Sequence, residues 1–133
     1  MRVNDEDLED SGDLVCYHGH PFTGTAVEYH ENGVLFAEID YVHGLTHGHW
    51  KLWALTGQPT IDSECRNGVR HGITTTYFGN GDLQSRAQYE FGIETSYTEW
   101  DDKRDILLSR LLGPDTPGAN YSLLLKFRSG SEK

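Results

Sequence analysis

The sequence predicts a mainly β protein, built as an elongated antiparallel sheet of consecutive β-hairpins. Three observations support this fold class: a repeat of 24 residues, turn signals at fixed places in each repeat, and period-two alternation between the turns. A fixed period of about 20–50 residues is typical of stacked supersecondary units. The repeats begin at Tyr17, Tyr41, Cys65 and Tyr89.

Glycine recurs in three columns of this repeat, and aromatic residues recur in a fourth. Glycine is favoured where a hairpin turn needs a positive φ, so these columns indicate turns. The columns are Gly24, Gly48 and Gly72; Gly33, Gly57 and Gly81; Gly44, Gly68 and Gly92; and Tyr29, Trp53 and Tyr77.

The first thirteen residues hold six acidic residues against Arg2 and show no periodicity. This composition predicts an acidic flexible arm over 1–13, with ordered structure starting near Leu14. The arm also lacks the apolar stretch of a secretory signal, so we expect a cytoplasmic protein.

The hairpin array is expected over 14–100. In its first unit, an outgoing strand over 24–30 and a returning strand over 34–42 flank a turn at Asn32-Gly33, a strong hairpin signal. Returning strands alternate apolar and polar residues, which predicts a sheet with one buried face and one solvent-exposed face. Outgoing strands are more mixed, because Trp50 and Trp53 fall on different parities, and their faces stay unassigned.

A C-terminal cap is expected over 101–133. Leucines at i, i+4 predict an amphipathic helix over 106–112, with acidic residues at its start and Gly113-Pro114 at its end. We expect this helix to cover the open end of the array, as terminal units of arrays do. A last strand is predicted over 121–127.

The net charge is −10, and no run of 18 apolar residues is present. These facts argue against a membrane span and against binding to nucleic acid or anionic lipid, and favour a basic protein partner. Cys16 and Cys65 are expected about two repeats apart, too far for a disulfide, and so to be free thiols.

Histidines are the main candidates for chemistry. His18/His20 and His47/His49 have the i, i+2 spacing that places two side chains on one face of a strand, where they could ligate zinc or copper. The competing interpretation is that they cap turns or pack, and we favour it. Cys16 lies near one such pair but has no evident oxyanion site. We therefore predict no metal, no cofactor and no catalytic residues.

An acidic patch is the best candidate for function. Acidic residues alternate along neighbouring returning strands, so they should form one surface, and basic residues are scarce in this half of the chain. A solvated face without a specific role is the alternative. The predicted partner-binding residues are Glu38, Asp40, Asp62 and Glu64, with Trp50 and Trp53 as possible anchors.

Four segments resemble the MORN repeat variant. Residues 41–48 and 65–72 are similar to its "y-x-n-G-x-x-h-G" part, and residues 29–35 and 77–83 to its "y-x-x-n-G-x-l" part. The resemblance covers roughly residues 17–92. The chain is similar to YwqK-type bacterial proteins, a resemblance that implies an antitoxin or an immunity protein against a polymorphic toxin.

From these observations we expect a non-enzymatic immunity protein that binds a toxin domain and occludes it, with the acidic surface meeting a basic one. The alternative is a MORN-type scaffold or a lipid- or protein-binding module. The oligomeric state stays open, because exposed edge strands permit association.

Overall fold

The computed structural model describes residues 1–131 of the 133-residue chain. The fold is mainly β, as predicted, and its main part is a nine-stranded sheet in the order β1-β5-β6-β7-β8-β9-β10-β11-β12. The strands of this sheet are β1 (Arg2–Asn4), β5 (Gly24–Tyr29), β6 (Leu35–Val42), β7 (Leu45–Trp53), β8 (Pro59–Arg66), β9 (Val69–Tyr77), β10 (Leu83–Glu90), β11 (Ile93–Trp100) and β12 (Ile106–Leu111).

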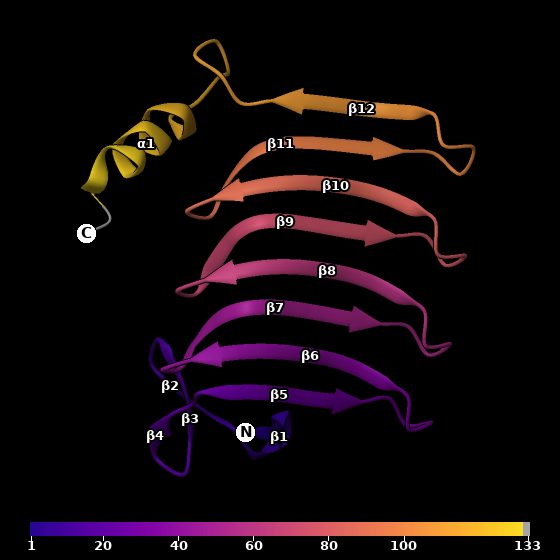
Figure 1. Ribbon diagram of the computed structural model, residues 1–133, viewed down its shortest axis with the longest axis vertical. Coiled ribbons are helices and arrows are strands. Elements are labelled where there is room, and N and C mark those ends of the chain that lie inside the picture. The colour runs from indigo at the N-terminus through magenta and orange to yellow at the C-terminus, as the bar shows by residue number, and fades with distance from the viewer. Residues whose placement is uncertain (132–133) are drawn as a thin grey trace.

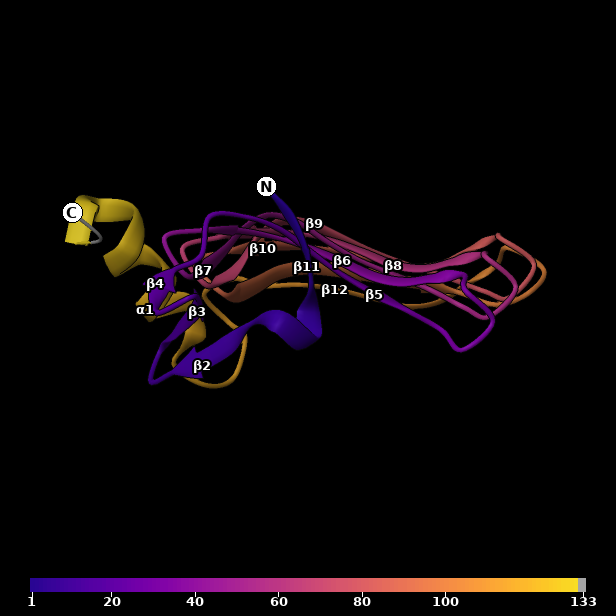
Figure 2. The same ribbon diagram turned by 90° about the horizontal axis from the view of Figure 1, so that it is seen from below.

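Consecutive strands from β5 to β12 are antiparallel neighbours, so the chain climbs the array one hairpin at a time (Figure 1). Seen from below, these strands overlie one another in a single curved layer (Figure 2). The sequence therefore produces a one-layer sheet, and neither face of this sheet packs against a large globular core.

Turns at the two ends of the array follow two patterns. At one end, two-residue turns have positive φ at both positions, as in His43-Gly44 (50° and 84°) and Asn67-Gly68 (50° and 87°). These values match the type I′ turns that suit the twist of a hairpin. At the other end, each turn is closed by paired backbone bonds, such as His30 N to Val34 O at 2.8 Å.

The N-terminal residues differ from the predicted flexible arm. They form β1, a 3₁₀ turn η1 (Asp5–Asp7) and β2 (Glu9–Ser11), which joins β3 (Leu14–Tyr17) and β4 (His20–Pro21) in a small sheet. β1 runs parallel to β5, with Val3 opposite Ala26. The prediction of a flexible arm was wrong because strand pairing satisfies the backbone N–H and C=O groups of this segment, even though its side chains are acidic.

The segment predicted as a helix over 106–112 is the strand β12. It pairs with β11 after a turn in which Asp101 Oδ1 accepts hydrogen bonds from the amides of Lys103 (2.8 Å) and Asp105 (2.9 Å). This turn repeats the pattern of the earlier ones, although Arg104 (φ 70°) stands where they have glycine. A run of apolar residues fits both a helix and a strand, and the neighbouring strand decided between them.

The segment predicted as a last strand over 121–127 is instead the helix α1 (Asn120–Lys126), followed by the π-helical turn η2 (Phe127–Ser131). Leu124 is its buried residue, and Phe127 stacks on Phe91 with ring centroids 5.1 Å apart. α1 lies beside the turns at one end of the strands, not along the edge of β12 (Figure 1). The C-terminal segment therefore does not cap the open edge.

No helix in residues 1–131 is long and apolar enough to cross a membrane.

Most buried positions in the sheet hold small side chains. Two large side chains are fully buried, Phe22 and Leu124, one in each terminal segment. The small buried residues of the sheet include Ala26, Ala37, Ser63, Thr74, Ser85 and Ala87.

Candidate functional site

One face of the sheet carries all four predicted acidic residues, and we call it the acidic face (Glu38, Asp40, Asp62 and Glu64). In an antiparallel sheet, residues directly opposite one another point to the same side. Lys51 is opposite both Glu38 and Asp62, and His49 is opposite Glu64. The register thus places the acids of β6 and β8 on the same face of the sheet, with β7 between them.

Two of these carboxylates satisfy backbone amides at irregular points of the ladder. Asp40 Oδ2 accepts a hydrogen bond from the amide of His49 (3.1 Å), and Glu64 Oε1 accepts one from the amide of Ile73 (3.0 Å). The pairing register shifts beside each acid, which leaves these amides without a ladder partner. Asp40 and Glu64 therefore have a structural role in the repeat, as acceptors for backbone amides.

Glycine makes this arrangement possible. Gly48 has φ 115°, and a Cβ atom built there would lie 2.9 Å from Asp40 Oδ2. Gly72 has φ 111°, and its Cβ would lie 3.0 Å from the Cβ of Glu64. Glycine is thus needed at Gly48 and Gly72 for two reasons: the backbone has a positive φ, and a carboxylate side chain approaches closely.

The other two acids are more available, and each has a surface partner. Glu38 Oε2 accepts a hydrogen bond from Arg2 Nη1 at 2.9 Å, and its side chain is 28% exposed. Asp62 Oδ1 lies 3.0 Å from His49 Nδ1, and its side chain is 37% exposed. Because surface pairs of this kind contribute only about 0–1 kcal/mol, an incoming cation can displace either partner.

Basic residues are closer to the acids than the sequence suggested. Lys51 lies in the row between Glu38 and Asp62, and Arg2 reaches Glu38 from the N-terminal strand. The acidic face is consequently a mixed row with excess negative charge.

Of the two tryptophans, Trp50 does not join the acidic face. Trp50 is opposite Ile39 and Ser63, so it points to the other side of the sheet from Glu38. Trp53, two residues after Lys51, has the parity of the acidic face and ends β7 beside the hairpin turns, where its carbonyl accepts a hydrogen bond from His30 Nε2 at 2.8 Å. The sequence could not assign these faces, because Trp50 and Trp53 fall on opposite parities and only the pairing register shows which parity faces the acids.

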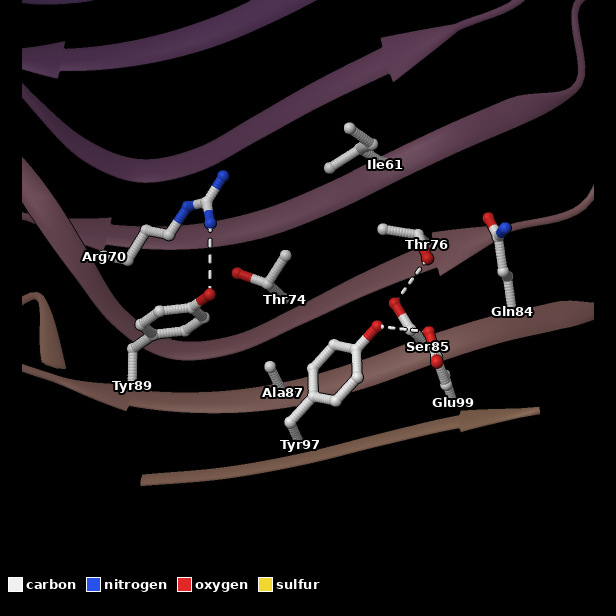
Figure 3. A pocket seen from close by; sticks show the side chains of 10 residues that line it. All are labelled: Ile61, Arg70, Thr74, Thr76, Gln84, Ser85, Ala87, Tyr89, Tyr97 and Glu99. Atoms are coloured by element: carbon white, nitrogen blue, oxygen red, sulfur yellow. Dashed lines mark hydrogen bonds between the residues drawn. The ribbon is translucent and has the colours of Figure 1, made fainter. Parts of the chain in front are cut away.

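On the side of Trp50, a shallow hollow of about 300 Å³ lies over β8 to β11. Hydroxyl pairs link its strands: Ser63 bonds Thr74 at 2.6 Å, and Thr76 bonds Ser85 at 2.5 Å. Figure 3 shows the side chains around this hollow, with Tyr89 and Tyr97 standing beside Ala87. We call this side the hydroxyl face.

Arginines and tyrosines border the hydroxyl face. Arg70 donates a hydrogen bond to Tyr89 Oη at 3.2 Å and lies 5.3 Å from the centre of that ring (Figure 3). Tyr97 Oη donates to Glu99 Oε2 at 2.7 Å, and this hydrogen bond raises the pKa of the Tyr97 phenol. Sequence reasoning missed this face, although Thr74 to Thr76 offered a signal: hydroxyls on alternate positions of a strand share one side.

The histidines take different structural roles. The Nδ1 atoms of His47 and His71 accept hydrogen bonds from the turn amides of Asn67 (3.4 Å) and Phe91 (3.0 Å), which agrees with the favoured turn-capping interpretation. His18 lies in a turn with φ 51°, so it does not share a strand face with His20. Within residues 1–131, no three His, Cys, Asp or Glu side chains gather as metal ligands.

The two cysteines are free thiols in separate sheets, with Cys16 in β3 and Cys65 in β8. Burial raises the pKa of the Cys65 thiol. This shift works against nucleophilic chemistry, because the thiolate is the reactive form.

Comparison with protein families gives two matches. The family model of the MORN repeat variant matches residues 22–43 and 70–90. These segments contain the hairpin β5–β6 and most of the strands β9 and β10. No curated protein matches the chain, and no solved structure matches it.

Proposed function

We propose that the chain is a stoichiometric binding protein that uses the acidic face to engage a basic surface on a partner protein. The observation that carries this proposal is the pair Glu38 and Asp62, two partly exposed carboxylates that flank one lysine on the same face of the sheet. A net charge of −10 adds long-range attraction to a basic partner and speeds its association.

The finer form of this proposal is an immunity protein or antitoxin. A toxin that acts on nucleic acid needs a basic substrate path, and a rigid sheet with spaced carboxylates can occupy that path in place of phosphates. Inhibition would then arise from occlusion, with no chemical step. The strong negative charge supports this form.

Capture of the partner tests the proposal. The full chain, carrying an affinity tag, is used as bait in lysate of its native cells, and retained proteins are identified by mass spectrometry. A second bait carries Glu38→Gln and Asp62→Asn, and a third carries Asp102→Asn and Asp115→Asn, which make the same charge change at exposed loop positions.

The proposal predicts one near-stoichiometric basic partner on the wild-type and loop-variant baits, with strong depletion on the second bait. Equal retention by all three baits would contradict a role for the acidic face. Inhibition of a toxic activity by the purified chain, at a one-to-one ratio, then decides the finer immunity form.

A scaffold or lipid- or protein-binding module is the second candidate, and the two MORN repeat variant matches favour it. Flotation with vesicles of anionic phospholipid separates the lipid version from the protein-binding version. Because the charge is −10, we expect the chain to stay at the bottom of the gradient. Co-flotation would support the lipid-binding module instead.

A further inference from the structure

The last strand of the large sheet, β12, leaves its outer edge open. β12 pairs with β11 on one side, and on its other side no strand of residues 1–131 pairs with it. In Figure 1, β12 is the outermost strand, and α1 lies beyond one end of it. An open edge offers a row of backbone donors and acceptors whose natural occupant is another strand.

Exposed apolar side chains accompany this edge. Ile106 and Leu107 are each 64% exposed, and Leu111 is 78% exposed. Native proteins usually protect an edge strand with charge, proline, a β-bulge or a covering segment. β12 has one charged residue, Arg110, and its one register shift lies near the start of the strand, between Ile106 and Leu108. Arg110 is held by Glu94 through two hydrogen bonds of 2.9 and 3.0 Å, so its charge is matched within the chain.

The other edge of the sheet is different. There, β1 pairs in parallel with β5 over Arg2–Asn4, opposite residues 25–27. β1 is only three residues long, and its Arg2 is engaged by Glu38. Two copies that join through their long open edges can therefore meet only β12 to β12. That contact is two-fold and closes on itself, so it does not build a filament.

The backbone pattern also selects a register. Leu112 N donates to Thr95 O at 3.0 Å, which directs the amide of Leu112 toward β11. Along a regular strand, successive residues direct their N–H and C=O groups to opposite sides, so Ser109 and Leu111 direct theirs outward. The register shift between Glu99 and Trp100 interrupts this alternation at Leu107. Antiparallel pairing centred on Ser109 sets the outward backbone groups of Ser109 against those of Ser109 in the second copy.

This register is also compatible with the side chains. It places Leu107 opposite Leu111 of the second copy, and Leu108 opposite Arg110. The two arginines do not face each other, and no acidic residue of β12 enters the seam, despite the overall charge of −10. Charge and apolar surface thus both favour self-pairing at this edge.

We propose that β12 is a self-association surface, through which two copies of this chain pair antiparallel about Ser109 and form one continuous sheet. The proposal is independent of the proposed function, because the acidic face lies on β6 and β8. The seam is small, so the dimer is expected at protein concentrations on the order of 100 µM.

Sedimentation velocity of the full chain across a concentration series tests the proposal. Ser109→Pro removes an outward amide without removing a bond to β11, and proline is tolerated on such an edge. Ser109→Ala is the matched control, because both variants lose the contact of 3.3 Å between Ser109 Oγ and Thr98 Oγ1. We expect dimers for the wild type and Ser109→Ala, and dissociation constants at least about tenfold larger for Ser109→Pro.

Monomer at every concentration would overturn the proposal, as would a dimer that persists in Ser109→Pro or species larger than a dimer. If Ser109→Pro fails to fold by circular dichroism, the double variant Leu107→Lys and Leu111→Lys replaces it, with the same expected loss of dimer.

A designed cross-link tests the register. Residues that exchange both bonds in an antiparallel pair have Cα atoms about 5.5 Å apart, within the range of a disulfide. Ser109→Cys should therefore give a reducible covalent dimer under mild oxidation, whereas wild-type protein, with Cys16 and Cys65, should not. A dimer in solution that gives no cross-link would overturn the register centred on Ser109.

Discussion

The carboxylate of Asp40 accepts a hydrogen bond from the backbone amide of His49 at a point where the ladder between β6 and β7 shifts register. One repeat later, Glu64 does the same for Ile73. Two acids that suggest a binding patch are thus also part of the hairpin architecture. This dual position separates the acidic face into a structural pair and an accessible pair, and the two pairs make different predictions.

Removing the Asp40 carboxylate should destabilise the fold. Asp40→Ala leaves the amide of His49 and the hydroxyl of Thr25, which donates to Oδ1 at 2.8 Å, without their acceptor. The expected loss in free energy of unfolding is about 1–3 kcal/mol, measured by urea denaturation. Asp40→Asn should lose less, since its amide oxygen still accepts. The comparison variant Asp62→Ala should cost about 1 kcal/mol or less; an equal cost for both alanine variants would refute the distinction.

A methyl group at Gly72 should be costly for two reasons. The residue has φ 111°, which side chains rarely adopt, and the new Cβ would lie 3.0 Å from the Cβ of Glu64. We expect Gly72→Ala to lower the free energy of unfolding by about 1–3 kcal/mol. Gly79→Ala is the matched control, because nothing lies within 4 Å of its Cβ, and it should change stability by about 0.5 kcal/mol or less. Indistinguishable melting of the two variants would contradict the close approach at Gly72.

The C-terminal segment should respond to acid through Glu90. A side-chain hydrogen bond from Arg128, with Nε 2.9 Å from Oε1, lowers the pKa of Glu90 below its ordinary value of 4.5. The folded-state pKa is depressed, so the stabilisation is fully present above pH 4.5 and is lost as the pH falls through the folded-state value. Thermal unfolding of the wild type and Glu90→Gln should differ near neutral pH and converge in acid. A difference that persists at pH 2 would contradict this assignment.

Native Cys65 should react slowly with thiol reagents. Burial raises the pKa of this thiol, so less thiolate is present near pH 8, and the side chain is also partly shielded. We expect chromogenic disulfide titration of the native chain to be much slower than titration in denaturant. A Cys16→Ser variant isolates the signal of Cys65, and a fast native reaction in that variant would count against the burial of Cys65.

Much of the fold could be predicted from the sequence, because turns and alternation are local. Turn residues such as Asn32-Gly33 mark the hairpins directly. The faces of the outgoing strands could not be predicted, because large apolar residues fall on both parities of β7 and only the pairing register assigns them. The strand β12 was mistaken for a helix because its leucines satisfy both periods, and only pairing with β11 distinguishes them.

The candidate site was predictable only in part, for the same physical reason. Alternation along the returning strands placed the acids on one side, but it contained no information about what each carboxylate would contact. The role of Asp40 depends on an amide nine residues away across a register shift, and the pairing of Glu38 with Arg2 depends on an N-terminal strand that composition alone did not indicate.

The salt dependence of partner binding tests the central claim most directly. Titration calorimetry of the captured partner, at several ionic strengths, would compare the wild type, the variant with Glu38→Gln and Asp62→Asn, and the loop variant with Asp102→Asn and Asp115→Asn. If Glu38 and Asp62 contact a basic surface, the first variant should bind at least about tenfold more weakly and show a shallower salt slope, with the loop variant close to wild type. Unchanged affinity and slope in the first variant would contradict binding through the acidic face.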